Sequence, residues 1–343
     1  MAQFEYLRKG FPLLIRYAGL LKPKVKSIQE IQINGAFNQS KEYRTFIYKP
    51  YSYYSKTPIF LMHGMSVYGV DDPRIHELAA ILCSSGFDVY IPEIKEISSL
   101  IASIDTPANI ADIYMSIANL TGKSPGLFLI SFSGGMGLIA MGDSRLEVHP
   151  NATMIVGGYT VFKSTMVYTM ENFDLDDYAC WIFLYNYIDL VFPVTDNLKK
   201  LFFQKAIDNG TKNFSSQESK ELENQLDVQE KQILKNISSN KEYRLELGNK
   251  LYTNGESIFY KLSPINYVNS LKGKFSILHG CSDPVLSEKE SIILSEKMKS
   301  IGIEHNLELT RLLSHGDKAS YAKNMIDIPG LANAFGYFMV NLG

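Results

Sequence analysis

A serine followed by two glycines stands where a short apolar run ends, in the sequence LFLISFSGGMG at residues 127–137. A strand that stops at a serine and turns directly into a helix is typical of a nucleophile elbow, which exposes the hydroxyl above the sheet. The residues two before and two after the nucleophile must be small, because strand and helix pass close together. Ser133 has Ser131 and Gly135 at these positions, with Ser131 in place of the usual first glycine. The pattern predicts Ser133 as a nucleophile; an ordinary glycine-rich turn is the alternative.

A serine hydroxyl is a poor nucleophile unless a base removes its proton. Of the six histidines, His315 lies in the segment LLSHGDKAS, after the last strand that the sequence predicts. This loop returns to the edge of the sheet that carries the serine. The other histidines fall in a helix, at the opposite edge or in tight turns before glycine. We therefore predict His315 as the base, against the alternative of a surface histidine.

An imidazole base needs a carboxylate that fixes its tautomer and stabilises its charged form. Asp283, in KFSILHGCSDPVLS, follows the end of another predicted strand and precedes a proline. Asp317 is close to His315 in sequence, but adjacency does not aim a carboxylate at the ring. We predict Asp283 as the orienting acid; the alternative is a turn aspartate that caps a helix.

Short apolar runs and amphipathic stretches alternate along the chain and would position these groups. Two alternating segments predict an antiparallel hairpin, at 27–37 and 43–50. Nearly continuous apolar runs predict parallel strands covered on both faces, at 58–64, 87–93, 126–133, 152–158 and 274–280, and a last strand is expected at 303–310. Helical stretches lie between them, at 72–86, 109–122, 134–143 and 287–302. This alternation predicts an α/β fold with a mostly parallel central sheet and helices on both faces.

One long interval interrupts the alternation and predicts an inserted helical cap at residues 161–262. It holds no clear strand, and Leu222, Leu226, Ile233 and Ile237 recur in it at near-helical spacing among charged residues. The predicted organisation is an N-terminal helix at 1–25, a core formed by 26–160 and 263–343, and this cap. An aromatic run inside the cap is too short and too interrupted to span a membrane.

The order serine, aspartate, histidine, with the serine in an elbow after a central strand, resembles the α/β-hydrolase superfamily. LMHGM, which contains His63 and Gly64, stands where this superfamily carries its oxyanion loop. LHGCSDPV and SHGD resemble its acid and histidine loops. The resemblance covers nearly the whole chain, and it implies that the backbone amides of Met65 and Gly134 form the oxyanion hole.

These motifs predict a serine hydrolase, similar to esterases and lipases, that cleaves a carboxylic ester through an acyl-enzyme. Seven apolar or aromatic cap residues suggest an apolar acyl group if they face the site, and packing within the cap is the alternative for each: Met166, Tyr168, Met170, Phe173, Trp181, Phe183 and Tyr185. An acyltransferase or a thioesterase would use the same triad. A non-catalytic binding protein of the same fold is the remaining alternative.

Composition excludes several other classes of function. The net charge of −2 gives no electrostatic reason to expect nucleic acid as a partner. No cluster of histidine, cysteine and carboxylate residues predicts a metal, and no motif predicts a cofactor. The three cysteines show no pairing pattern, which favours a reducing compartment and a cytoplasmic protein. The expected partner is a small-molecule ester, and the oligomeric state is left open.

The N-terminal stretch is apolar and basic, but no small-residue cleavage site follows it, so we do not expect a signal peptide. Apolar residues between Phe4 and Leu21 recur at roughly helical spacing, with Arg8, Lys9 and Arg16 among them. Packing of this helix on the core is the favoured interpretation. Peripheral contact with an anionic membrane is the alternative.

Overall fold

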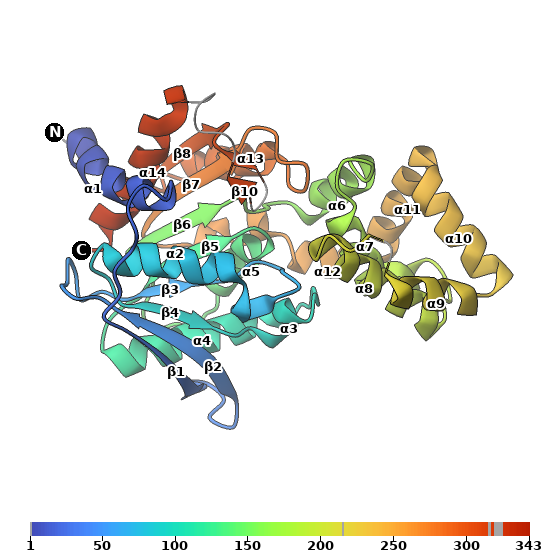
Figure 1. The fold of residues 1–343 in the computed structure, drawn as a ribbon, viewed down its shortest axis with the longest axis horizontal. Helices are drawn as coiled ribbons and strands as arrows, with labels where there is room; N and C mark the ends of the chain where they lie inside the picture. The colour runs from blue at the N-terminus through green and yellow to red at the C-terminus, as the bar shows by residue number, and fades with distance from the viewer. Residues whose placement is uncertain (1, 215, 315–316, 319–324) are drawn as a thin grey trace.

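A single eight-stranded sheet forms the centre of the molecule (Figure 1). The computed structural model describes residues 2–214, 216–314, 317–318 and 325–343. The strands lie in the order β1-β2-β4-β3-β5-β6-β7-β8. Their bounds are β1 Ser27–Asn34, β2 Glu42–Lys49, β3 Ile59–Leu61, β4 Val89–Pro92, β5 Gly126–Ile130, β6 Ala152–Val156, β7 Lys274–Gly280 and β8 His305–Thr310. A second, two-stranded sheet pairs β9 (Leu313–Ser314) with β10 (Asp317–Lys318).

Strand direction follows the hydrophobic pattern of each strand. β2 is antiparallel to β1 and to β4, whereas all strands from β4 to β8 are parallel. β3, β4 and β5 are buried almost throughout, as expected where helices cover both faces of a sheet. Each of the eight strands predicted from the sequence is present. Because β3 to β7 are parallel, their carboxyl ends meet at one edge of the sheet.

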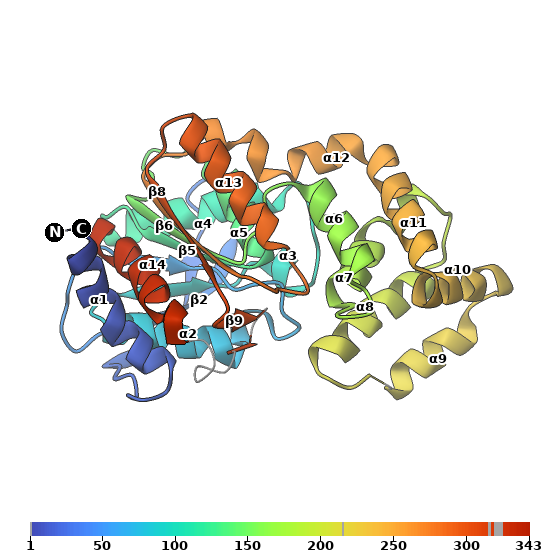
Figure 2. The same ribbon diagram turned by 90° about the horizontal axis from the view of Figure 1, so that it is seen from above.

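Helices cover both faces of the sheet (Figure 2). One hydrophobic cluster joins α1 (Ala2–Tyr17), α2 (Pro73–Ser84) and α14 (Ile328–Asn341) to one face. The other cluster joins α4 (Thr106–Thr121), α5 (Phe132–Ala140) and α13 (Glu288–Ser300) to the opposite face and continues into the cap. The short helix α3 spans Lys95–Ser98, and 3₁₀ turns occur at Gly69–Asp71, Ile188–Leu190, Pro264–Asn266, Val268–Ser270 and Met325–Asp327. None of the described helices combines the length and apolarity needed to cross a bilayer.

The segment between β6 and β7 is helical and projects from one end of the core (Figure 1). Its helices are α6 Phe162–Glu171, α7 Tyr178–Tyr187, α8 Asp196–Gly210, α9 Gln217–Gln225, α10 Val228–Ser239, α11 Lys241–Asn254 and α12 Glu256–Lys261. The charged stretch that the sequence presents as one helical pattern is divided into α9 and α10. Asp227 forms a reciprocal capping box with Glu230 and starts α10 there. The exact domain limits stay a prediction.

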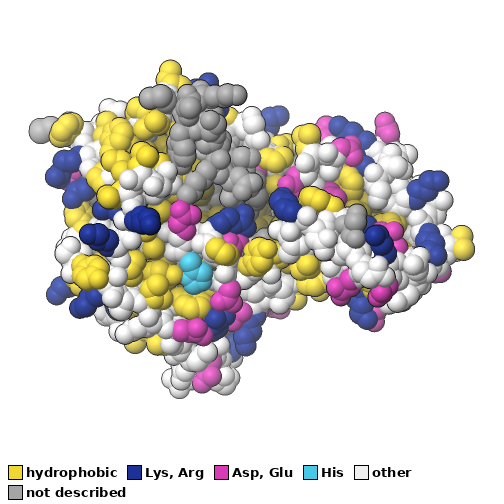
Figure 3. Space-filling view, viewed as in Figure 1, with side chains coloured by type: hydrophobic (Ala, Val, Ile, Leu, Met, Phe, Trp, Pro, Cys, Tyr) yellow, Lys and Arg dark blue, Asp and Glu magenta, His cyan; other side chains and the backbone are white. Residues whose placement is uncertain are grey.

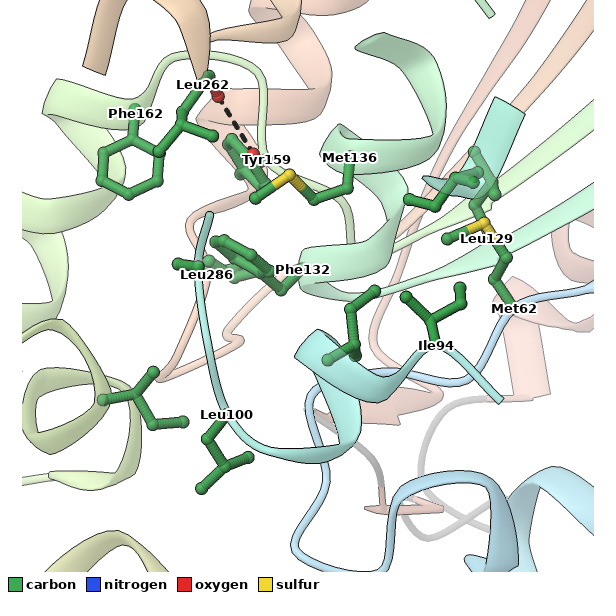
Figure 4. Close-up of a cluster of buried hydrophobic side chains, with 14 of the residues drawn as sticks. Met62, Ile94, Leu100, Leu129, Phe132, Met136, Tyr159, Phe162, Leu262 and Leu286 are labelled. Carbon is green, nitrogen blue, oxygen red and sulfur yellow. Dashed lines mark hydrogen bonds between the residues drawn. The ribbon is translucent and has the colours of Figure 1, made fainter. Parts of the chain in front are cut away.

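Aromatic residues join the cap to the core (Figure 4). Phe132 of α5 stacks on Tyr159 with ring centroids 4.9 Å apart, and the Tyr159 hydroxyl donates to the Leu262 carbonyl over 3.0 Å. Tyr159 and Leu262 belong to the two chain segments that connect core and cap. The buried Glu290 carboxylate also accepts the backbone amides of Thr160 and Val161 at 2.8 and 2.7 Å. The attachment of the cap is therefore tightly hydrogen-bonded.

Candidate active site

The turn after β5 has the backbone strain expected of a nucleophile elbow, but at Ser131. Ser131 adopts φ 57° and ψ −133° and precedes the first residue of α5. A non-glycine residue at positive φ is costly and persists only where the surrounding structure holds it. Two hydrogen bonds hold this turn: the Ser131 amide donates to the Val156 carbonyl over 2.8 Å, and the Gly134 amide donates to the Ser131 carbonyl over 2.8 Å.

Ser133 is not the exposed serine of this turn, and the geometric part of that prediction is wrong. Its side chain is fully buried inside the first turn of α5. Its hydroxyl donates to the Ile130 carbonyl over 2.7 Å and accepts the Ile130 amide at 3.2 Å. Ser133 thus fastens the end of β5 to the start of α5. Ser131, which the sequence placed in a supporting role, lines the cavity described below.

Shifting the centre of the elbow to Ser131 places Leu129, a large residue, two positions before it. Gly137 accommodates this side chain, because a Cβ at Gly137 would lie 2.6 Å from Leu129 Cδ2. On the other side, Ser133 is the small residue that the turn requires. Gly134 and Gly135 allow α5 to pass close to the segment after β6: a Cβ at Gly134 would lie 3.0 Å from Gly158 Cα. A Cβ at Gly135 would lie 2.2 Å from the Tyr159 ring, so its lack of a side chain makes room for that ring, which is a different contact from the close passage of strand and helix that the sequence predicted.

The loop after β3 lies directly against Ser131. A Cβ at Gly64 would be 3.5 Å from Ser131 Cβ, an ordinary van der Waals distance, so the two residues are direct neighbours. His63 is buried, and its ring is hydrogen-bonded to the Gly64 carbonyl at 3.0 Å and to the Ile94 amide at 3.3 Å. Burial lowers the pKa of His63 to about 4. The imidazole is thus neutral near pH 7, donates through Nδ1 and accepts through Nε2, and supports the loop.

The two backbone amides assigned to the oxyanion hole, those of Met65 and Gly134, have different surroundings in the structure. The Gly134 amide donates to the Ser131 carbonyl, so it is engaged within the turn and the assignment of Gly134 is wrong. Phe132, which directly follows Ser131, is the first residue of α5, and the amides of a first helical turn have no partner within the helix. Met65 lines the cavity next to Ser131 and Gly64. Phe132 directly follows Ser131, and Met65 directly follows Gly64, so both residues are neighbours of Ser131.

Asp283 lies after β7, buried at the same edge of the sheet. Oδ1 accepts the amides of Val285 and Leu286 at 2.8 and 2.9 Å, which fixes the carboxylate in the loop. Oδ2 lies near Gly157: a Cβ at Gly157 would be 3.7 Å from this oxygen. The residue thus combines the turn-capping role considered from the sequence with a place on the cavity wall.

The predicted base, His315, lies outside the described residues, as does the side chain of Asp317. The other five histidines are described. His279 is buried, with Nδ1 2.7 Å from Ser291 Oγ and Nε2 2.9 Å from the Leu286 carbonyl, so it supports the acid loop. Among these five, His63 alone lines the cavity, and its depressed pKa and two hydrogen bonds do not suit a base.

A cavity of about 290 Å³ brings together Gly64, Met65, Ser131 and Asp283. Apolar side chains contribute to its wall, including Ile130 and Val156 from the ends of β5 and β6 and Val285 from the loop after β7. None of the seven cap residues considered for an acyl site lines it; Met166, Met170, Phe173, Trp181 and Phe183 are buried in the cap. Among the described residues, no group of three histidine, cysteine or carboxylate side chains is placed to hold a metal ion.

Two cap tyrosines hold the loops that form the site. The Tyr178 hydroxyl, from α7, donates to the Met65 carbonyl over 2.9 Å. The Tyr168 hydroxyl, from α6, donates to the Asp283 carbonyl over 2.7 Å. Burial raises the pKa of both phenols, so both remain protonated donors at neutral pH. Sequence reasoning missed these contacts because nothing in the order of residues brings the cap onto the two loops.

A mostly parallel sheet with helices on both faces places the protein in the α/β class. A strained serine stands at the end of one of its central strands. Solved structures with a similar fold include Porphyromonas gingivalis dipeptidyl peptidase 4 (TM-score 0.53, 11% identity, 92% of this chain and 36% of that one). Others are Pyrococcus horikoshii acylaminoacyl peptidase (0.52, 13%, 94% and 43%) and a puromycin hydrolase (0.53, 11%, 92% and 39%). The chain has the α/β-hydrolase fold, as its motifs predicted.

This similarity has two limits. The chain spans about two fifths of the length of these proteins, and their low sequence identity makes the likeness one of fold. No protein-family model matches the sequence, and no curated protein matches it.

Proposed function

We propose that this protein is a serine hydrolase that cleaves a carboxylic ester through an acyl-enzyme formed on Ser131. The observation that carries the proposal is the strained conformation of Ser131 at the end of β5, on the wall of a cavity that Gly64, Met65 and Asp283 share. Strain of this kind is retained at sites where geometry matters for chemistry.

The assigned roles follow from the chemistry of acyl transfer. Ser131 Oγ attacks the ester carbonyl while His315 takes its proton and then gives it to the leaving alcohol. Asp283 orients the imidazole and stabilises its charged form. Water activated by His315 releases the acid and regenerates the serine. His315 is retained because none of the five described histidines suits a base and its loop follows β8.

The amides of Met65 and Phe132 would stabilise the oxyanion that forms in both steps. Such donors act on charge that develops in the transition state, and each contributes about 3 kcal/mol. The cavity of about 290 Å³, with Ile130, Val156 and Val285 in its wall, favours a small, apolar acyl group. This volume is at the low end for small-molecule sites.

Peptide or amide cleavage is the second candidate, favoured by the fold likeness to proteins named as peptidases. Both reactions share one acyl-enzyme, so the leaving group distinguishes them. Turnover of p-nitrophenyl esters of increasing chain length should be compared with turnover of aminoacyl p-nitroanilides. We expect fast release from short esters and slow release from anilides. Faster turnover of the anilides would replace the ester proposal with a peptidase.

The nature of the acceptor and the requirement for Ser131 need separate tests. Adding a primary alcohol or a thiol during ester turnover should leave the free acid as the main product; a dominant new ester or thioester would indicate an acyltransferase. Ser131→Ala should abolish turnover without loss of thermal stability. Wild-type protein that turns over no ester or anilide would instead support a non-catalytic binding protein.

A further inference from the structure

Helix α1 has two different faces, and its inner face is part of the fold. Leu13 and Leu14 are buried in the hydrophobic cluster that includes α14. The two helices touch backbone to backbone: a Cβ at Gly10 would overlap the Ala332 carbonyl, and a Cβ at Gly336 would overlap the Tyr6 carbonyl. Figure 2 shows α1 beside α14, at the end of the molecule opposite the cap. The helix is therefore fixed in place, and its outer face points away from the core.

The outer face of α1 exposes large apolar side chains in one row. Phe4, Phe11 and Ile15 are separated by seven and four residues, so they lie on one side of a helix. Leu20 and Leu21 continue the exposed apolar surface after the helix ends, and Leu20 is 80% exposed. Figure 3 shows hydrophobic side chains gathered over α1, with Lys and Arg side chains beside them.

This apolar row is embedded in positive charge. The first 26 residues contain six lysines and arginines and one acidic residue, Glu5, whereas the whole chain has a net charge of −2. Arg8 lies in the same row as Phe4 and Phe11, and Lys22, Lys24 and Lys26 follow Leu21 and are exposed. The N-terminal segment is thus a strongly basic, apolar surface on a slightly acidic protein.

Exposed tyrosines border the same surface. The turn after β2 presents Tyr51, Tyr53 and Tyr54 to solvent. The Lys9 ammonium lies 3.7 Å from the Tyr54 ring centroid, which places this turn next to α1. A shallow hollow is lined jointly by Leu21, Lys22 and Tyr51. Tyrosines and lysines beside apolar residues are the composition found at membrane–water interfaces.

We propose that an exposed surface on and beside α1 binds an anionic phospholipid membrane, with the helix lying in the plane of the membrane. This surface, the α1 face, is formed by Phe4, Arg8, Phe11, Ile15, Leu20, Leu21, Lys22, Lys24 and Tyr51. The apolar row enters the boundary between headgroups and acyl chains, and the basic residues contact anionic headgroups. The inner face of α1 keeps its contacts with α14. Structural packing and membrane contact therefore use opposite sides of one helix.

Charge favours a membrane over a second copy of the chain as the occupant. A two-fold symmetric dimer through this face would place the same basic residues of both copies against each other. Anionic lipid neutralises them instead, at about fivefold in affinity for each lysine or arginine near the surface. Tyr17, the last residue of α1, lines the cavity that contains Ser131, so binding in this way would hold the cavity near the lipid.

The test is sedimentation with vesicles of phosphatidylcholine alone and of phosphatidylcholine mixed with phosphatidylserine. Deleting the helix would also remove buried contacts, so exposed positions are changed instead. One variant carries Phe4→Gln and Phe11→Gln, and a second carries Lys22→Gln and Lys24→Gln. Matched controls on the cap are Leu175→Gln with Val228→Gln, and Lys220→Gln with Lys235→Gln, which also change exposed residues.

We expect salt-sensitive binding to the vesicles that contain phosphatidylserine, at least tenfold weaker binding by both α1-face variants, and unchanged binding by both controls. Thermal unfolding of all variants should match that of the wild type. Absence of wild-type binding, or equal loss in the cap controls, would overturn the proposal. A dimer abolished by the apolar variant, without vesicle binding, would assign the face to self-association. Ester turnover is not part of this test, so its outcome is independent of the proposed function.

Discussion

The edge of the sheet and the helical cap both hold polar side chains, but they use them differently. At the sheet edge, the half-buried Ser131 and the buried Asp283 line a cavity. In the cap, Arg244 is buried and donates to the carbonyls of Met170 and Ile237 and to Asp174. A buried polar group on a cavity wall can meet a substrate, whereas one bonded to its neighbours on every side stabilises the fold. Changes at these two kinds of position should therefore have separable effects.

The largest effect on turnover is expected at the sheet edge. Asp283→Asn should lower kcat by about 10⁴-fold, because asparagine cannot stabilise the imidazolium. Asp143→Asn is the control, since Asp143 pairs with Arg145 and does not line the cavity. Steady-state kinetics of ester hydrolysis would measure both. A mild effect of Asp283→Asn together with a severe effect of Asp317→Asn would show that the acid is in the other loop.

The cap should respond in stability instead of turnover. Arg244→Leu removes the donors for two buried carbonyls and for Asp174, and should lower the free energy of unfolding by about 3 kcal/mol. Lys241→Gln breaks an exposed cap ion pair with Glu171 and should change stability little. Urea unfolding would measure both. An Arg244→Leu protein as stable as the wild type would contradict a purely structural role for this polar cluster.

His63 links the candidate site to the stability of the fold, because this buried, neutral side chain supports the loop after β3. Its pKa is lowered from 6.5 to about 4 in the folded state, so the unfolded chain binds more protons between these values. Its contribution to stability is complete above pH 6.5 and is lost as the pH falls toward 4. At pH 5 the loss should reach about 2 kcal/mol. His63→Gln should reduce this loss in urea unfolding at pH 7 and pH 5; equal losses in both proteins would contradict it.

The smallest effect is expected where the cap touches the site. Tyr178→Phe removes the hydroxyl that holds the Met65 carbonyl and should lower kcat about fivefold with little change in KM. The matched control is Tyr187→Phe, whose hydroxyl donates to the Ala102 carbonyl and whose side chain does not line the cavity. Kinetics of both variants would compare them. Equal kcat for the two variants would mean that the cap does not position the loop after β3 for catalysis.

Sequence patterns predicted the fold well because its determinants are local. Each strand is a short apolar run bounded by polar or turn residues, and alternation with amphipathic helices specifies parallel pairing. The C-terminal helix α14 and the break at Asp227 were not anticipated. Helix α14 depends on tertiary packing. The break at Asp227 depends on a helix N-cap residue that lies within an otherwise continuous helical pattern.

The candidate site was predicted less well, because contacts between residues that are distant in sequence decide which side chains fit around the serine. Leu129 breaks the expected small-residue pattern around Ser131, and this favoured the register centred on Ser133. The compensating Gly137 lies one helical turn further on, and only its contact with Leu129 explains the exception. The aromatic cap residues were ambiguous because the same residue types line apolar pockets and fill cores. A signal available from the sequence was the β-rich run 126–130, which ends directly before Ser131.

The most direct test of the account is to find which serine reacts with a fluorophosphonate. Mass spectrometry of the labelled wild-type protein should place the adduct on Ser131. Ser133→Ala, which loses the internal hydrogen bond to Ile130, should still be labelled, and Ser131→Ala should not. An adduct on Ser133, or labelling that persists in Ser131→Ala, would contradict the assignment of the strained residue as the nucleophile.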